Sequence, residues 1–473
     1  MIFKNANQRI NLTTALILSL SQLVCLAGFL YFMSFGKNNF AWLILLIPFQ
    51  FIIWILLFQN NQLLLLAAAI MAPIAICQLI PNDYQQFLFF PSVIFFLLVL
   101  KFTPWLDDYL DAKSGNLPVA EKISSVLLLS WIILSFIFAI IRGPVYHFFV
   151  TCNILILEVF IIGYFFAIIP QNQNEIKRLI HAITIGVVIC VLSLPFLVKY
   201  SAGFVDTFGG KKLSGPFGIL DLNALGLLIA TLAAALLGIL IGEQQFKRRL
   251  LLSIIILILF AGLVFTRSRG AWFGFGMAVL YLLIKSRSAI LAALTGAGGL
   301  FLLLSSFLRS LFISRVESTS FADPAFVARL ILWNFGLLVA RKNWLLGVGW
   351  ENFRFLKYYY GYPRLFDPKV YFSTHNLYIE TMADLGFIGF LLFVILLFGT
   401  IVRTNRLISQ NCSEYQHIAL GVTAALIAFA AHSAFDSLSS TFMVIGMWFG
   451  LAMALQRLAS KSRVSSLEND LFG

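Results

Sequence analysis

The chain has 473 residues and a net charge of +13, and 60% of its residues are apolar whereas only 11% are charged. Together with a mean hydropathy of +0.94, this composition excludes a string of soluble domains and indicates a polytopic membrane protein. The positive charge does not indicate a nucleic-acid-binding protein, because no basic block with interleaved aromatic residues lies in a soluble region. The five cysteines lack the paired spacing of a disulfide framework or a zinc site, so no metal and no cofactor is predicted.

Apolar runs long enough to cross a bilayer follow one another along almost the whole chain, since a membrane-spanning helix needs about 20 mostly apolar residues. The runs lie at about 12–32, 40–58, 62–80, 86–102, 123–141, 145–169, 179–199, 219–241, 250–266, 270–284, 289–308, 376–402, 418–435 and 439–456. We therefore expect an all-α polytopic integral membrane protein with about 12–14 transmembrane helices, forming a single transmembrane domain over residues 1–473. Lys4 and Arg9 precede the first run, which has no small-residue cleavage site and is expected to stay as a span.

The distribution of cations predicts the orientation, because short cytoplasmic loops collect lysine and arginine. With the N-terminus inside, the cytoplasmic segments hold seventeen of the 33 cationic residues, the short outer loops hold seven, and residues 309–375 hold the other nine. This asymmetry predicts that both termini are cytoplasmic and that residues 309–375 form a long outer loop inserted between two spans.

The outer loop is rich in aromatic residues, and an amphipathic helix is expected within it. Asp323 and Pro324 form a typical helix start, with Asp as the N-cap and Pro in the first turn. The expected apolar face, with spacings of three to four, consists of Phe326, Leu330, Trp333 and Leu337. We expect this helix to lie on the membrane surface, to direct Arg329 along the bilayer face and to end near Asn343. The following GVGWENF is expected to be a tight turn, since no strand precedes its glycines as in a phosphate-binding loop.

Two arginines occupy a very short outer turn, TRSRG at 266–270. Arg267 and Arg269 lie where the orientation rule disfavours cations, and charge at membrane depth is costly enough to indicate a role. The alternative is that both side chains extend to the headgroups as ordinary interfacial arginines. Asn223, in SGPFGILDLNALG at the outer start of another span, is either a helix-start polar group or a substrate contact.

Five histidines are present, and the predicted topology places His375 at the outer start of the span beginning near 376. Ser-Thr-His-Asn, with Asn376 and Glu380 close behind, offers more hydrogen-bonding groups than a lipid-facing helix end needs. His432 and Asp436 lie near the outer end of another span. They are expected either to support the site as second-layer groups or to form an i,i+4 pair that caps their helix.

Two further acidic features have alternatives that the sequence leaves open. Asp107, Asp108 and Asp111 form DDYLD, which is similar to a magnesium–diphosphate motif, but no second acidic cluster accompanies it and a solvated cytoplasmic loop is favoured. Glu158 falls deep within a predicted span, where it is either part of an ion route or a structural counter-ion.

The outer histidine and arginines together fit one class of chemistry. Guanidinium groups bind diphosphate through two parallel hydrogen bonds without a metal. A neutral imidazole can take a proton from an alcohol. Because nucleotide sugars are cytoplasmic, an activated sugar on the outer side must arrive on a lipid diphosphate.

At these residues the chain resembles the O-antigen ligase and O-antigen polymerase (Wzy-type) superfamily of bacterial envelope glycan enzymes. The similar segments are GPFG and LNALG within 215–226, FTRSRGAW at 265–272, ARLILWNFG to GVGWENF within 328–353, STHNLYIETMADLGFIG at 373–389 and AHSAFDSL at 431–438. The resemblance covers about the C-terminal half of the chain.

The resemblance implies a role for each matched residue. Arg269 and Arg329, with Arg267 as a helper, would bind the diphosphate of an undecaprenyl-diphosphate-linked glycan. His375 would be the general base on an acceptor hydroxyl, in one inverting step without a metal; Asn376, Glu380, Asn223, His432 and Asp436 would be supporting residues.

The resemblance also implies a bacterial inner membrane protein whose long loop is periplasmic. Its partners would be the lipid bilayer, an acceptor glycan or glycolipid and envelope-assembly proteins, but not nucleic acid. An anion transporter of the bicarbonate type remains the alternative, with Glu158 and the outer arginines as its path. Against it, the two halves show no matching pair of Gly- or Pro-broken spans.

Overall fold

The computed structural model describes residues 162–200, 203–207, 210–215, 218–287, 324–350, 352–353, 373–409, 415–436 and 439–472, together with short pieces within 65–73 and 127–137. The predicted spans at 12–32, 40–58, 86–102 and 289–308 lie outside the described residues, and those at 62–80, 123–141 and 145–169 are described only in part. DDYLD, His147 and Glu158 also lie outside them.

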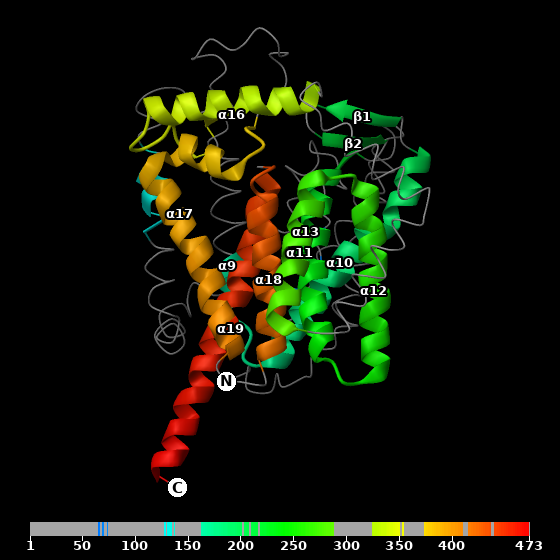
Figure 1. The fold of residues 1–473 in the computed structure, drawn as a ribbon, viewed down its shortest axis with the longest axis vertical. Coiled ribbons are helices and arrows are strands. Elements are labelled where there is room, and N and C mark those ends of the chain that lie inside the picture. Colours follow the sequence, from blue (N-terminus) through cyan, green and yellow to red (C-terminus); the bar gives the residue numbers. More distant parts are fainter. Residues whose placement is uncertain are drawn as a thin grey trace, which may run out of the picture.

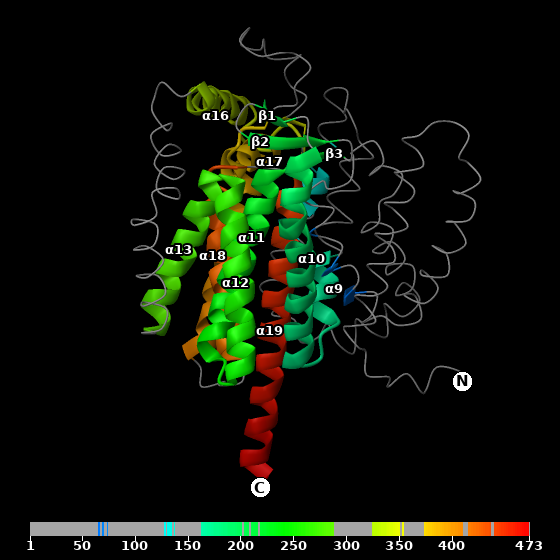
Figure 2. The same ribbon diagram turned by 90° about the vertical axis from the view of Figure 1, so that its right-hand side faces the viewer.

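The described chain is a bundle of long apolar helices (Figures 1 and 2). Its helices are α9 (Ile162–Ile168), α10 (Gln173–Tyr200), α11 (Leu222–Gly242), α12 (Phe246–Thr266), α13 (Arg269–Ser286), α16 (Pro324–Lys342), α17 (Leu377–Ser409), α18 (Gln416–His432) and α19 (Ser439–Phe472). Within the described residues, α10, α11, α12 and α17 are each long and apolar enough to cross a membrane. The prediction of a helical polytopic membrane protein is confirmed.

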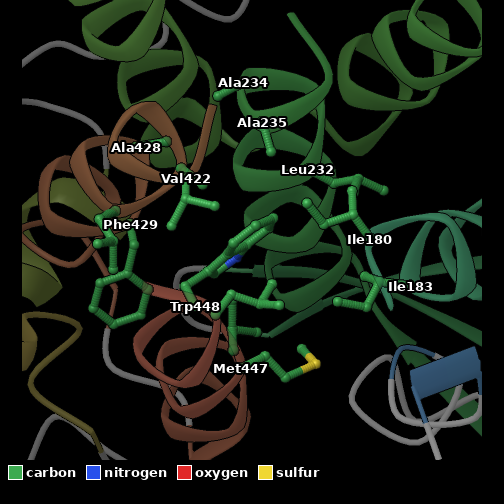
Figure 3. Packing of buried hydrophobic residues seen from close by; sticks show 14 of the residues in the cluster. Ile180, Ile183, Leu232, Ala234, Ala235, Val422, Ala428, Phe429, Met447 and Trp448 are labelled. Carbon is green, nitrogen blue, oxygen red and sulfur yellow. The ribbon is translucent and has the colours of Figure 1, made fainter. Parts of the chain in front are cut away.

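Helix α11 is the centre of the bundle. It is buried along nearly its whole length, as expected of a helix that is apolar on all sides. Gly238 lets α18 approach closely, because a Cβ atom there would lie 2.4 Å from the Cα atom of Gly421. Trp448 of α19 fills the space between α10, α11 and α18 (Figure 3), and its side chain is among the largest that are fully buried.

A three-stranded antiparallel sheet links α10 to α11 and was not predicted. Its strands are β1 (Gly203–Thr207), β2 (Gly210–Gly215) and β3 (Gly218–Asp221), in the order β1-β2-β3. The strands are short and rich in glycine, so they lack the alternation of apolar and polar residues that marks a strand in a sequence. The sheet lies at the same end of the bundle as α16 (Figures 1 and 2), and it brings the chain back to the start of α11.

Helix α16 lies across the end of the bundle, roughly perpendicular to the spans (Figure 1). It begins at Pro324 and ends at Lys342, as predicted. The apolar face predicted for this helix is not the face that packs against the bundle. The face that packs against the bundle is instead formed by the buried side chains of Ala328, Leu332, Phe335 and Val339, while Leu337 is 46% exposed. Both faces are apolar, so spacing alone could not distinguish them, and Gly336 favours the observed one by allowing Ile379 and Thr374 to approach.

Helix α17 is broken at Gly386, whose φ of 69° and ψ of −175° are not helical. The predicted tight turn of GVGWENF fills this break. Gly347 and Gly349 have positive φ angles, and the amides of Val348 and Gly349 donate to the carbonyls of Ala383 and Asp384 at 3.1 and 2.9 Å. The segment of α17 before the break therefore lies flat beneath α16 (Figure 1), with His375 immediately before it.

Candidate active site

The loop before α17 is held by two side chains of its own sequence. Asn376 is the N-cap, and its Oδ1 atom accepts from the amides of Tyr378 and Ile379, both at 3.1 Å. Glu380 reaches back and accepts from the hydroxyl of Ser373 at 2.9 Å and from the amide of Thr374 at 2.8 Å. The Glu380 carboxylate therefore shapes this loop, because it binds the two residues before His375.

His375 has a left-handed backbone conformation and a buried acidic partner. Its φ angle is 50°, a conformation that a residue with a Cβ atom adopts only when its surroundings enforce it. Its Nδ1 atom lies 3.1 Å from Oδ1 of Asp436, and the side chains are 15% and 3% exposed. The loop therefore directs the Nδ1 edge of the imidazole at Asp436.

The charge of Asp436 is maintained by its neighbours. Burial disfavours the ionised carboxylate, but the hydrogen bond and charge of His375, with His432 and Arg329 nearby, outweigh it and lower the pKa of Asp436 from 3.8 to about 2. An ionised carboxylate can only accept a hydrogen bond. His375 must therefore donate through Nδ1, so the lone pair of the neutral form of its imidazole lies on Nε2.

The end of α18 and the start of α17 are joined directly, which explains how residues 61 positions apart form this pair. The amide of Leu377 donates to the carbonyl of Ser433 at 2.8 Å. The hydroxyl of Tyr378 donates to the carbonyl of Ala430 at 2.8 Å. Helix α18 ends at His432, so Asp436 lies in the turn beyond it and pairs with His375. Of the two alternatives for His432 and Asp436, the i,i+4 pair within one helix does not form, because α18 ends at His432 and Asp436 lies beyond it.

The TRSRG turn packs between α11 and α18. Arg267 closes α12 in a left-handed conformation, and Ser268 caps α13 by accepting from the amide of Ala271 at 3.4 Å. Arg269 is the first residue of α13 and is partly buried, whereas Arg267 is exposed. A Cβ atom on Gly270 would lie 3.4 Å from Cδ2 of His432, so the turn contacts the end of α18 that carries the buried histidine.

The remaining predicted site residues lie at the same end. Arg329 of α16 is close enough to act electrostatically on both His432 and Asp436. Asn223 lies in the first turn of α11, one turn before Gly226, whose Cβ position is 3.1 Å from Cβ of Ser268. At this end His375, His432 and Arg329 all act electrostatically on Asp436.

The sequence did not predict the pairing of His375 with Asp436 or the part that Ser373 and Thr374 have in shaping the loop. The only sequence signal was the clustering of polar residues at two predicted outer helix ends. Within the described residues, no group of three or more His, Cys, Asp or Glu side chains is arranged to hold a metal ion.

Comparisons with known proteins agree with this arrangement. Residues 254–394 match the O-antigen ligase family, a range that contains TRSRG, α16 and the loop with His375. The chain is 24% identical over 328 residues to a protein of Rickettsia conorii named "putative polysaccharide ligase", covering 65% of this chain and 74% of that protein. The resemblance to the O-antigen ligase family that the local segments indicate is therefore confirmed.

Proposed function

We propose that this chain is a membrane glycosyltransferase that moves a glycan from undecaprenyl diphosphate to an acceptor hydroxyl on the periplasmic side of the bacterial inner membrane. The family match supports an O-antigen ligase-type membrane enzyme. The observation that carries the catalytic proposal is the 3.1 Å contact between Nδ1 of His375 and the buried carboxylate of Asp436.

In this proposal His375 is the general base. Asp436 accepts from Nδ1 and so keeps the lone pair on Nε2 available. The acceptor hydroxyl gives its proton to Nε2 while its oxygen attacks the anomeric carbon, and Asp436 stabilises the imidazolium that forms. The bond from the anomeric carbon to the diphosphate breaks in the same step, so the sugar configuration inverts.

The arginines act on the leaving group. Undecaprenyl diphosphate leaves as an anion and needs charge neutralisation more than a proton. Arg269 at the start of α13 and Arg329 on α16 would bind its oxygens from two sides. The exposed Arg267 would assist them. Asn376 and Glu380 would keep the loop in the conformation that directs His375 toward Asp436. Asn223, in the first turn of α11, would be a supporting residue.

The acceptor would be a second lipid-linked glycan or a glycolipid, and the superfamily contains both polymerases and ligases. We favour assembly of a polymer, with the periplasmic loop at 309–375 contacting sugars through its aromatic residues. Envelope-assembly proteins would receive the product. No nucleic acid, metal or cofactor takes part in this proposal.

The test is glycan transfer by purified protein in lipid nanodiscs, with a lipid-diphosphate-linked glycan as donor. His375→Ala is expected to lower the turnover by about 100- to 10,000-fold, the usual contribution of a general base, and Arg269→Ala to weaken donor use strongly. His417→Ala, at the opposite end of α18, is the matched control and should retain activity. Transfer by His375→Ala at the wild-type rate would exclude the proposed mechanism.

A further inference from the structure

His432 is a buried histidine whose ring the mechanism above does not use. Its side chain is 0% exposed, and neither Nδ1 nor Nε2 has a hydrogen-bond partner among the described residues. A buried polar group without a partner costs folding free energy. An apolar side chain of similar size would pack here without that cost, so stability alone does not account for an imidazole at this position.

The N-terminal end of α13 and the cation Arg329 both lie close to His432. The Cδ2 and Nε2 atoms of its ring lie 3.4 and 3.6 Å from the Cβ position of Gly270, which follows Arg269 in the first turn of α13. Arg329 acts on the ring electrostatically from α16. Asp436 is the acidic group that acts on it, and that carboxylate is hydrogen-bonded to His375.

The start of α13 is itself suited to an anion. The first-turn amides of a helix point outward along its axis and carry partial positive charge, so phosphate groups bind at such ends. Helix α13 has 18 residues, and its first residue is an arginine. The unpartnered imidazole of His432 lies against this first turn. A side chain that lacks a hydrogen-bond partner therefore lies beside a helix end that attracts anions.

We propose that the start of α13 and His432 together form a phosphate subsite, in which the His432 ring donates a hydrogen bond to an oxygen of the donor's diphosphate. Burial first, and then the nearby Arg329, disfavour the charged imidazolium, so the neutral ring keeps one N–H to donate. An anionic oxygen accepting from this N–H would also be bound by Arg269, the first residue of α13. This inference rests on the proposed function. It adds His432 to the residues that, as the resemblance implies, bind the leaving group.

The experiment measures binding of undecaprenyl diphosphate, with undecaprenyl monophosphate for comparison, to full-length protein in nanodiscs by native mass spectrometry. His432→Phe keeps a flat ring and removes the donor, so diphosphate affinity is expected to fall by roughly ten- to a hundred-fold, the value of a hydrogen bond to a charged group. His432→Gln retains a donor and should bind within about three-fold of wild type. His417→Phe, the same change at the other end of α18, should not alter binding.

Thermal stability and kinetics separate this role from a structural one. Because His432→Phe removes unpartnered polar atoms, its Tm is expected to equal or exceed that of the wild type. In transfer assays the KM for the donor should rise more than kcat falls. Wild-type diphosphate affinity in His432→Phe would overturn the subsite, as would a lower Tm with unchanged affinity or a loss of kcat at unchanged KM. Failure of the wild-type protein to bind undecaprenyl diphosphate at all would instead overturn the proposed function.

Discussion

The two ends of α18 each carry a histidine, and the two histidines differ in burial and in their charged neighbours. His432 at one end is fully buried against the α13 turn, near Asp436 and Arg329. His417 at the other end is partly buried and lies against Gly242, the last residue of α11, where a Cβ atom would be only 2.0 Å from the ring. One histidine thus belongs to a cluster of charged groups, whereas the other fills the space left by a glycine.

This contrast extends to the helices around α18. At the His417 end the chain passes from α11 to α12 through a short exposed segment, and Lys177 of α10 acts electrostatically on His417. Among the described residues, four connections lie at the His432 end: the sheet before α11, the TRSRG turn, the loop before α17 and the turn after α18. The polar groups lie at the end where loops connect the helices, as is usual for functional sites on a rigid scaffold.

The largest effect within this comparison is expected for Asp436→Asn. The amide keeps the size of the side chain but cannot stabilise an imidazolium or enforce the Nδ1–H form of His375, so kcat is expected to fall by roughly a hundred-fold or more. Steady-state transfer assays would measure it. Glu175→Gln, which neutralises a first-turn carboxylate at the opposite end, should change kcat by less than about two-fold.

The Asp436→Asn variant also tests how the activity depends on pH. Because the pKa of Asp436 is lowered to about 2, the carboxylate of the folded enzyme stays charged at every pH above about 4. Any loss of wild-type activity between pH 8 and pH 5 must then come from a group other than Asp436. If the acidic limb of the pH–kcat profile is unchanged in Asp436→Asn, Asp436 and His375 are not coupled as proposed.

A smaller effect is expected for Arg269→Lys. Lysine keeps the charge but loses the planar pair of donors that matches a diphosphate, so the KM for the donor is expected to rise about ten-fold. Helix α13 supplies its own control, since Arg287 lies just beyond its other end. Arg287→Lys should behave as the wild type. An equal rise in KM for both variants would mean that the two ends of α13 do not differ in their effect on donor binding.

The sequence predicted the helices at this end better than their arrangement. The apolar runs at 219–241, 250–266 and 270–284 became α11, α12 and α13 with small shifts, because each run is long and bounded by polar residues. The helix at Pro324 was predicted from its cap residues, but its inward face was not, because a helix with two apolar faces gives no preference until a neighbour is known.

The site was predicted as a set of residues but not as a set of contacts. His375, Asp436 and the arginines stood out because polar groups at predicted outer ends are costly without a role. That Asp436 would pair with His375, rather than with His432 in its own segment, depends on α18 ending at His432 and on the amide of Leu377 donating to Ser433. Both are properties of the packed chain, and no local spacing contains them.

The smallest effect on the chemistry, and a clear one on stability, is expected for Gly386→Ala. The φ and ψ of Gly386 lie in a region open almost only to glycine, and a Cβ atom there would be 2.3 Å from the carbonyl oxygen of Leu345. The strain and the clash should lower the free energy of unfolding by about 3 kcal/mol or more, seen as a lower Tm in nanodiscs. Gly276→Ala, whose Cβ atom would meet nothing within 4 Å, should be neutral or stabilising by up to about 1 kcal/mol.

Because the break directs only the flat segment of α17 and not the His375–Asp436 contact itself, the Gly386→Ala protein that remains folded should retain kcat within a few-fold. A loss of kcat at unchanged Tm would show instead that the break positions the catalytic histidine.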